Sequence, residues 1–240
     1  MRIAILSDIH ANLEALEAVL KDAALQGCTG HVCLGDMVGF GADDAACVDR
    51  VRDLACPVVK GDFDETASDG SSLDQMNPVA AEHYSRIREQ LGAERQLWLR
   101  RLTFVREVED FTIVHSSLDR PAGWYYVTNQ FDAMSSFSYQ STQVCFHGHT
   151  HVPRVFVKTK KVEELPATTV AIEEGAKYFV NAGSVGQPRD GDWRACYVIH
   201  DLENRRIIFR RVDYDLGQAQ AKIIDSGLPP MQAERLADGR

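Results

Sequence analysis

Cys145-Phe146-His147-Gly148-His149-Thr150-His151 is the most informative stretch of this sequence, because it sets three histidines at alternate positions after a short apolar run. The chain of 240 residues contains only eight histidines. Alternate residues of an extended segment point to the same side, and Gly148 lets the backbone approach a neighbour closely. The stretch therefore predicts a group of imidazoles at a strand end, which could bind a metal ion if other elements supply more ligands.

The composition is that of an ordinary globular chain, with 45% hydrophobic and 25% charged residues. The length suits one α/β domain, and we assign residues 1–240 to a single domain. The net charge of -9 argues against general nucleic-acid binding, because phosphate backbones attract basic surfaces. It does not exclude a small anionic substrate, since bound metal ions reverse the local field.

Cysteine use and hydropathy predict a cytoplasmic protein without a membrane segment. The six cysteines form no Cys-x-x-Cys pair, so we expect them to be reduced and mostly buried. The opening run Met1-Arg2-Ile3-Ala4-Ile5-Leu6 is too short for the apolar part of a signal peptide. No apolar stretch approaches the ~20 residues that cross a bilayer.

The first part of the chain repeats a strand, an acidic loop and a helix. The strands are expected at 3–6, 31–34 and 57–60, and the loops after them are Asp8-Ile9-His10, Gly35-Asp36-Met37-Val38-Gly39 and Gly61-Asp62-Phe63-Asp64. Asn12 is suited to cap the first helix, Gly27 ends it, and a second helix covers about 44–54. Sheets with crossover helices bind ligands beyond the carboxyl ends of their strands. We therefore expect the three acidic loops at one edge of one sheet.

The rest of the chain continues the α/β pattern. We expect a helix over about 75–103 that Gly92 interrupts, paired strands at 104–108 and 111–114, an aromatic loop at 119–130, a helix at 130–139, strands at 144–146, 155–158 and 178–181, an antiparallel pair at 195–200 and 207–212, and helices at 216–226 and 230–237. The polar segment 160–176 is interpreted as a hairpin with a mobile tip.

The candidate metal ligands all follow predicted strands. They are Asp8, His10, Asp36, Asp62, His115, His149 and His151. Imidazole and carboxylate together suit divalent transition metals and magnesium-like ions better than soft metals. Asp36 has two carboxylate oxygens and could bridge two ions. A pair of ions ~4 Å apart can clamp a phosphoryl group and generate hydroxide near neutral pH.

In type, order and context these motifs resemble the calcineurin-like metallophosphoesterases. They are Asp8-x-His10, Gly35-Asp36-x-x-Gly39, the 61–64 loop, His115 and Gly148-His149-Thr150-His151. The segments 36–41 and 181–189 and the tail from Tyr214 are similar to the small prokaryotic phosphodiesterase subgroup, which includes diadenosine-tetraphosphatase-like proteins.

The resemblance implies a two-sheet α/β sandwich flanked by helices, with two divalent ions (Mn, Fe, Ni, Zn or Mg). One ion would take Asp8, His10, Asp36 and His151, and the other Asp36, Asp62, His115 and His149. A metal-bridging hydroxide, positioned through Asp36, Asp62 and His115, would attack phosphorus.

The 61–64 loop departs from the family pattern, which reads Gly-Asn-His-Asp/Glu. Asp62 replaces an amide by a carboxylate, so two ions and three carboxylates leave a charge of +1 where the amide would leave +2. Phe63 stands where the resemblance implies a histidine that helps protonate the leaving oxygen or stabilises the transition state, and phenylalanine can do neither. General acid catalysis is typically worth ~10²–10⁴-fold. The sequence therefore predicts a slow enzyme that prefers phosphoanhydrides and aryl phosphodiesters to alkyl phosphate esters. His147 and Asp64 are left open as substitute acids.

Other residues keep two interpretations each. His147 is interpreted as a packing residue rather than a ligand. Trp124, Tyr125 and Tyr126 could stack a nucleobase or be ordinary surface aromatics, and Arg189 could contact a substrate phosphate or pair with Asp190 or Asp192. We retain Arg189 and Trp124 as candidate substrate-binding residues.

The leading hypothesis is a metal-dependent phosphoesterase that acts on a small phosphorylated substrate, with a nucleotide as one option. The changes at Asp62 and Phe63 also fit a low-activity regulatory module that binds metal and nucleotide. A serine/threonine protein phosphatase is less favoured, because the short chain has no obvious extra loop to build a peptide groove. A homodimer could form through the tail helices or the 160–176 segment.

Overall fold

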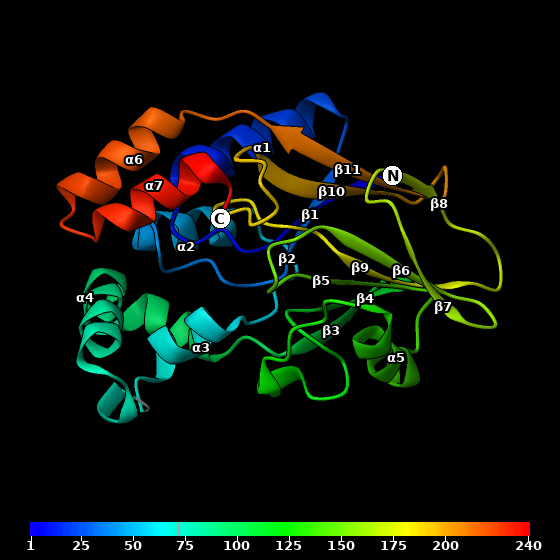
Figure 1. Cartoon of the computed structure of the whole chain (residues 1–240), viewed down its shortest axis with the longest axis horizontal. Coiled ribbons are helices and arrows are strands. Elements are labelled where there is room, and N and C mark those ends of the chain that lie inside the picture. The colour runs from blue at the N-terminus through cyan, green and yellow to red at the C-terminus, as the bar shows by residue number, and fades with distance from the viewer. Residues whose placement is uncertain (72) are drawn as a thin grey trace.

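Two mixed β-sheets lie face to face, and helices flank them (Figure 1). The computed structural model describes residues 1–71 and 73–240. One sheet has the strand order β2-β1-β10-β11-β8, and the other has the order β3-β4-β5-β9-β6-β7. This arrangement confirms the expected two-sheet α/β sandwich.

The elements follow the expected order closely. The strands are β1 (Arg2–Leu6), β2 (Gly30–Cys33), β3 (Val105–Val108), β4 (Phe111–Val114), β5 (Val144–His147), β6 (Arg154–Lys158), β7 (Val162–Leu165), β8 (Thr169–Ala171), β9 (Lys177–Asn181), β10 (Ala195–Asp201) and β11 (Arg206–Val212). The helices are α1 (Leu13–Leu25), α2 (Asp44–Asp53), α3 (Asp62–Asp69), α4 (Pro78–Arg100), α5 (Gln130–Tyr139), α6 (Leu216–Asp225) and α7 (Pro230–Asp238), with short 3-10 turns at Leu73–Gln75 and Pro121–Gly123.

Alternate residues of β1 serve two different cores. Ile3 and Ile5 pack in the core between the sheets, whereas Ala4 and Leu6 pack against helices α1, α2, α6 and α7. A third cluster joins α5 to the outer face of the second sheet, with Cys145 of β5 among its members. Because successive side chains of a strand point to opposite faces, each sheet packs on both sides. The layers are therefore the helices on the first sheet, the two sheets, and α5 on the second sheet.

Asn12 and Gly92 have the local roles predicted for them, and Asn77 caps a helix as Asn12 does. The Asn12 side chain accepts a hydrogen bond from the Ala15 N–H and caps α1. Asn77 caps α4 in the same way through the Ala80 N–H, and Gly92 breaks that helix with φ 64° and ψ 174°. A positive φ at this position favours glycine.

The prediction of a hairpin at 160–176 is wrong. β7 pairs with β6 in the second sheet, but β8 pairs with β11 in the first, so the segment crosses from one sheet to the other. Val170 and Ile172 are buried in the core between the sheets. The pairing of β8 with β11 buries these two side chains, and this tertiary contact decides the conformation over the local preference for a hairpin.

The region 57–64 also differs from its prediction. Residues 57–60 form only isolated bridges, Cys33 with Val58 and Val59 with Thr103, rather than a strand. The expected loop at 61–64 is the beginning of α3, whose first turn contains Asp62, Asp64 and Glu65. Acidic residues are favoured in a first helical turn because they face the positive end of the helix dipole.

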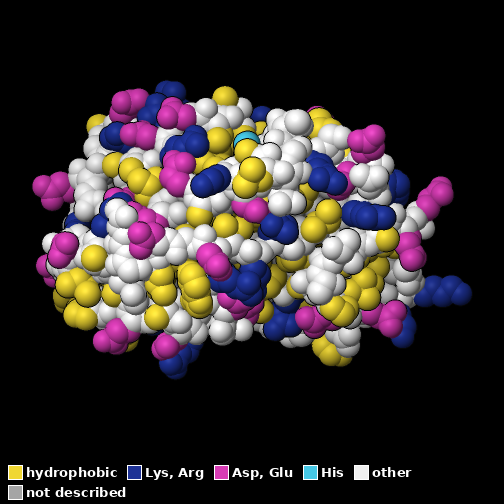
Figure 2. Space-filling model, turned by 90° about the horizontal axis from the view of Figure 1, so that it is seen from above, with side chains coloured by type: hydrophobic (Ala, Val, Ile, Leu, Met, Phe, Trp, Pro, Cys, Tyr) yellow, Lys and Arg dark blue, Asp and Glu magenta, His cyan; other side chains and the backbone are white. Residues whose placement is uncertain are grey.

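The surface carries charges of both signs. Figure 2 shows Lys and Arg side chains interspersed with Asp and Glu over the face seen from above. Over residues 1–71 and 73–240, none of the helices has an apolar stretch long enough to span a bilayer.

Folding stability is expected to fall as the pH drops from 6.5 towards 4, because of His200 on β10. This residue is 3% exposed, and its ring packs edge-on against Phe111 and Phe146 at centroid distances of 5.1 and 5.2 Å. Burial lowers the pKa of His200 to about 4, from the usual 6.5. Protons therefore bind the unfolded chain first, which costs about 2 kcal/mol of stability by pH 5.

Urea unfolding at pH 7 and pH 5 measures this effect, with a chelator present so that bound metal does not contribute. His200→Leu is expected to lose about 2 kcal/mol less stability between the two pH values than the unaltered chain. Equal losses in the two proteins would contradict the role of this histidine.

Candidate metal centre

The structure brings the seven candidate ligands together at the edge where β1, β2, β4 and β5 end. They form two groups, and within each group the donor atoms lie within 4.8 Å of one another. One group is Asp8, His10 and His151, and the other is Asp36, Asp62, His115 and His149. Each group could hold a metal ion.

Asp36 lies between the two groups. Its Oδ2 atom is 3.6 Å from His10 Nε2 and 3.4 Å from His115 Nε2. Its other oxygen, Oδ1, accepts a hydrogen bond from the Phe63 N–H at 2.9 Å. One carboxylate oxygen is therefore available to both groups, which is the geometry that a bridging ligand needs.

Asp8 is fixed by its neighbours in the same way. Ser7 Oγ donates to Asp8 Oδ2 at 2.5 Å, and the His149 N–H also donates to this carboxylate. The Oδ1 atom faces His151 Nε2 at 3.3 Å. The His149 N–H reaches both oxygens, at 3.2 and 3.1 Å, so Ser7 and the His149 backbone fix the carboxylate while its Oδ1 faces the centre.

Four imidazoles at the centre are each tied to a backbone carbonyl by the nitrogen that points away from it. The pairs are His10 Nδ1 with Val38 O at 2.9 Å, His115 Nδ1 with Leu34 O at 2.8 Å, His151 Nδ1 with Gln187 O at 2.5 Å and His149 Nε2 with Trp124 O at 2.9 Å. A carbonyl can only accept, so the bonded nitrogen carries the hydrogen. In a neutral ring the other nitrogen then presents a lone pair to the centre, which is the usual support for a metal-bound histidine.

These lone pairs have few protein partners. His10 Nε2 and His151 Nε2 face one another at 3.0 Å, and with both outer nitrogens donating to carbonyls neither has a hydrogen to share. Among the described residues, His115 Nε2 and Asp62 Oδ1 are buried and make no hydrogen bond. Facing lone pairs and buried carboxylate oxygens are unfavourable without a cation, so this donor set fits divalent metal ions.

Burial and neighbouring charges shift the pKa values of the candidate ligands in both directions when no cation is bound. It lowers the pKa of His10 to about 3 and moves the pKa of His151 well below its usual value, so both rings are neutral at pH 7. Burial raises the pKa of Asp8 and, together with the nearby Asp62 charge, that of Asp36. Burial disfavours the charged form of His115, but the Asp36, Asp62 and Asp8 carboxylates outweigh it and raise the His115 pKa well above its usual value.

Five of the candidate ligands have left-handed backbone conformations. The φ angles are 53° at Asp8, 46° at His10, 53° at Asp36, 69° at His149 and 61° at His151. Such conformations are uncommon for residues other than glycine, and strained backbone concentrates at functional sites. The expectation that His147, His149 and His151 share one side of an extended segment is therefore wrong, because the chain turns sharply after β5.

His147 stays in β5 and belongs to neither group of candidate ligands. Its ring stacks on Phe179 at 4.1 Å with an interplanar angle of 15°, and its Nδ1 atom lies 3.4 Å from Asn181 Nδ2. Burial lowers the pKa of His147 to about 3. This placement is that of a packing residue.

Asp64 is not placed to act as an acid. Its two oxygens accept hydrogen bonds from the N–H groups of Asp36, Met37 and Gly61 at 2.7, 3.0 and 3.1 Å. Burial raises the pKa of Asp64 to about 6. The side chain holds the loop of Asp36 against the start of α3, so it is a positioning residue.

Arg189 pairs with neither of the acidic residues considered for it. Asp190 pairs with Arg211, and Asp192 pairs with Arg194 at 2.6 Å. Arg189 Nη2 instead donates to Gln187 Oε1 at 3.0 Å, and its Nε is buried without a partner among the described residues. Its positive charge contributes to the low pKa values of His10 and His151, so it lies near the first group of ligands.

The aromatic loop supports the centre mainly through its backbone and Tyr126. The Trp124 carbonyl holds His149, and the Trp124 ring packs edge-on against Phe104 at 5.7 Å. Tyr126 stacks on the His149 ring at 4.4 Å with an interplanar angle of 17°. Both tyrosines are half exposed, Tyr125 to 50% and Tyr126 to 54%, and Tyr125 lies beside Arg120. The sequence does not predict the contact of Tyr126 with His149, because no local signal tells which loop aromatic stacks on a ligand.

Comparison of the chain with known proteins identifies its family. The model of the calcineurin-like phosphoesterase superfamily domain matches residues 1–205. An uncharacterized protein of Methanocaldococcus jannaschii is 36% identical over 243 residues, which cover 99% of this chain and 98% of the relative. The crystal structure of a metallophosphoesterase from Sphaerobacter thermophilus has a TM-score of 0.88 and 38% identity, covering 100% of this chain and 99% of that one.

A hypothetical protein of Pyrococcus horikoshii has the same fold, with a TM-score of 0.79 at 18% identity and coverage of 100% and 98%. The resemblance drawn from the sequence motifs is thus confirmed. The chain belongs to the calcineurin-like phosphoesterase superfamily.

Proposed function

We propose that this chain is a metal-dependent phosphoesterase that hydrolyses phosphodiester or nucleotide phosphoanhydride bonds. The observation that carries the proposal is the set of four imidazoles that hydrogen bonds to backbone carbonyls orient, two in each group of ligands, with Asp36 Oδ2 between the groups. Membership of the phosphoesterase superfamily supports the reaction class.

In this proposal Asp8, His10 and His151 would hold one divalent ion, Asp62, His115 and His149 would hold a second, and Asp36 would be available to both. The bound ions would supply Lewis acidity and activate a water for attack on phosphorus. Manganese, iron, nickel, zinc and magnesium are all compatible with imidazole and carboxylate ligands. Arg189, which has donors to spare, is suited to bind a phosphate oxygen.

Hydrolysis forms a bond from the water oxygen to phosphorus and breaks the bond from phosphorus to the leaving oxygen. Phe63 donates its backbone N–H to Asp36, but its ring packs against His10 and has no proton to give to the leaving oxygen. Asp64 uses both oxygens on backbone N–H groups. Substrates with good leaving groups, such as phosphate or phenolate, are therefore favoured. The proton of the attacking water passes to solvent.

His149→Leu is expected to lower the metal content from two ions per chain to one, because it removes a donor from only one of the two groups. The matched control is His147→Leu, which changes a histidine two positions away that stacks on Phe179. The control is expected to keep two ions. Elemental analysis after equilibration with manganese measures both contents, and a loss of metal in the control alone would contradict the ligand assignment.

Metal analysis and turnover on one panel of substrates test the proposed function. The panel contains diadenosine polyphosphates, cyclic nucleotides, and aryl phosphate mono- and diesters. Phe63 also favours a second candidate, a regulatory module that binds metal and nucleotide with little turnover. Hydrolysis of at least one anhydride or aryl diester with saturating manganese supports the enzyme, whereas binding without turnover on any substrate supports the module.

A further inference from the structure

A hollow lies beside the metal centre, on the far side of two phenylalanine rings. It has a volume of about 560 Å³ and lies between the first turns of α4 and the turn that joins α6 to α7. Its apolar wall includes Phe40, Phe63, Tyr84 and Leu228. Ligand pockets in proteins have typical volumes of about 300–1,000 Å³ and a mainly apolar, aromatic lining, and this hollow meets both criteria.

The wall of the hollow is in direct contact with a candidate metal ligand. The Phe40 and Phe63 rings lie 4.8 and 5.0 Å from the His10 ring and 4.7 Å from each other, and Phe63 contacts Tyr84 at 5.5 Å. A Cβ atom at Gly39 would come within 2.4 Å of the Phe63 ring. Glycine at this position therefore lets the phenylalanine ring fit between His10 and the hollow.

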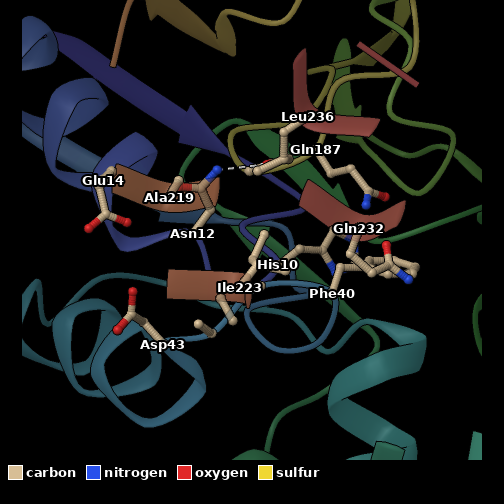
Figure 3. Close-up of a pocket in the computed structure, with 14 residues that line it drawn as sticks. His10, Asn12, Glu14, Phe40, Asp43, Gln187, Ala219, Ile223, Gln232 and Leu236 are labelled. Atoms are coloured by element: carbon tan, nitrogen blue, oxygen red, sulfur yellow. Dashed lines mark hydrogen bonds between the residues drawn. The ribbon is translucent and has the colours of Figure 1, made fainter. Parts of the chain in front are cut away.

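The C-terminal helices complete the hollow. Gln232 of α7 and Phe40 line the hollow. The same two residues also line a crevice of about 10 Å³ that reaches His10 and Gln187, and Figure 3 shows this crevice. Lys222 fixes α6 by ion pairs with Glu14 at 2.5 Å and Asp43 at 2.8 Å. The matched superfamily domain ends at residue 205, so α6 and α7 add a wall that lies beyond it.

We propose that this hollow binds an aromatic group, a nucleobase or an aryl ring, of the phosphoester whose phosphate lies at the metal centre. The inference rests on the proposed function for the position of the phosphate. Flat aromatic walls stack on planar rings of either kind. The Asn77 amide nitrogen, whose oxygen caps α4, offers donors at the hollow, and Gln232 offers an acceptor, Oε1, that has no partner among the described residues; both suit the polar edge of a base. Phe63 thus has a positive role as a binding wall, in the position where the resemblance leads one to expect an acid.

Calorimetric binding to the manganese-loaded full chain tests the inference without requiring turnover. Adenosine 5′-monophosphate and ribose 5-phosphate differ only by the base, and 4-nitrophenyl phosphate and ethyl phosphate differ by an aryl ring. The aromatic member of at least one pair is expected to bind about tenfold more tightly than its partner. A preference in the first pair identifies a nucleobase as the occupant, and a preference in the second alone identifies an aryl ring. Equal affinities within both pairs overturn the proposal.

Two substitutions in α4 should fill the hollow. Ala80→Trp and Val79→Trp both change lining residues, and Val79 is 73% exposed, so the second variant is well placed to keep the fold. Each is expected to abolish the tenfold preference while leaving the affinity for the non-aromatic partner unchanged. Ala81→Trp, next to the lining but outside it, is the matched control and should keep the preference. Retention of the preference in folded Val79→Trp and Ala80→Trp would overturn the location.

The failure of this inference and the failure of the proposed function give different results. Aromatic-dependent binding with no hydrolysis of any phosphoester would support the aromatic-binding role of the hollow and contradict the proposed phosphoesterase activity. Hydrolysis with no aromatic preference would leave the enzyme and reject the hollow.

Discussion

Asp36→Asn is expected to reduce hydrolysis of bis(4-nitrophenyl) phosphate by about 10³-fold or more, which corresponds to about 4 kcal/mol of transition-state stabilisation. The Oδ2 atom of Asp36 faces both His10 Nε2 and His115 Nε2, so its charge serves both groups of ligands. Asparagine keeps an oxygen for the Phe63 N–H but cannot supply this negative charge. The change should therefore weaken both metal sites while it preserves the local hydrogen bond.

Steady-state rates and metal content measured on the same samples check this expectation. Asp44→Asn is the matched control, because Asp44 is another buried carboxylate that accepts a backbone N–H, from Gly39 at 2.7 Å, and it lies outside both ligand groups. The control should keep its metals and its rate. Full activity in Asp36→Asn would sink the proposed two-metal reaction.

Phe63→His is expected to raise turnover on alkyl phosphodiesters by about 10²-fold or more, and to change turnover on aryl diesters little. The Phe63 ring lies beside His10, so an imidazole at this position would stand next to the metal centre. An imidazole can protonate an alkoxide, which is a poor leaving group. A phenolate leaves without a proton and gains little from the new acid.

The ratio of alkyl to aryl turnover is the decisive measurement, because a change in folding or metal content alters both rates together. Phe40→His is one control: it places an imidazole at Phe40, whose ring also contacts His10. The Asp36 carboxylate accepts a hydrogen bond from the backbone of Phe63 and not from that of Phe40. Phe63→Leu keeps an apolar side chain. Neither control should raise the ratio, and an unchanged ratio in Phe63→His would reject the account of the missing acid.

The order of strands and the identity of the candidate ligands could be predicted because both depend on short-range patterns. Apolar runs mark the strands, and six of the seven candidate ligands follow a strand within a few residues, whereas Asp62 begins α3. The assignment to the calcineurin-like superfamily depends on the same motifs and is confirmed. The residues that the structure gathers at the centre are the ones that these motifs contain.

What could not be predicted depends on contacts between distant segments. The carbonyls of Leu34 and Trp124 orient histidines far along the chain, and any residue type would supply the same carbonyl. The crossing of 160–176 between the sheets depends on the burial of Val170, which a polar-looking sequence conceals. The hollow beside Phe63 needs α4 and the α6–α7 turn to meet, and no local pattern encodes that meeting.

The left-handed conformations at the candidate ligands lower folding stability at the same positions that supply the metal-binding donor atoms. A side chain adds a cost of about 1 kcal/mol to a left-handed backbone conformation, which glycine avoids. Five ligand positions have this conformation although none of them is glycine. A thermostabilisation programme guided by backbone geometry alone would choose glycine at Asp8, His10, Asp36, His149 and His151, and each choice would delete a donor atom. A heat-resistant variant that keeps its chemistry must therefore draw its improvements from positions away from this edge of the sheets.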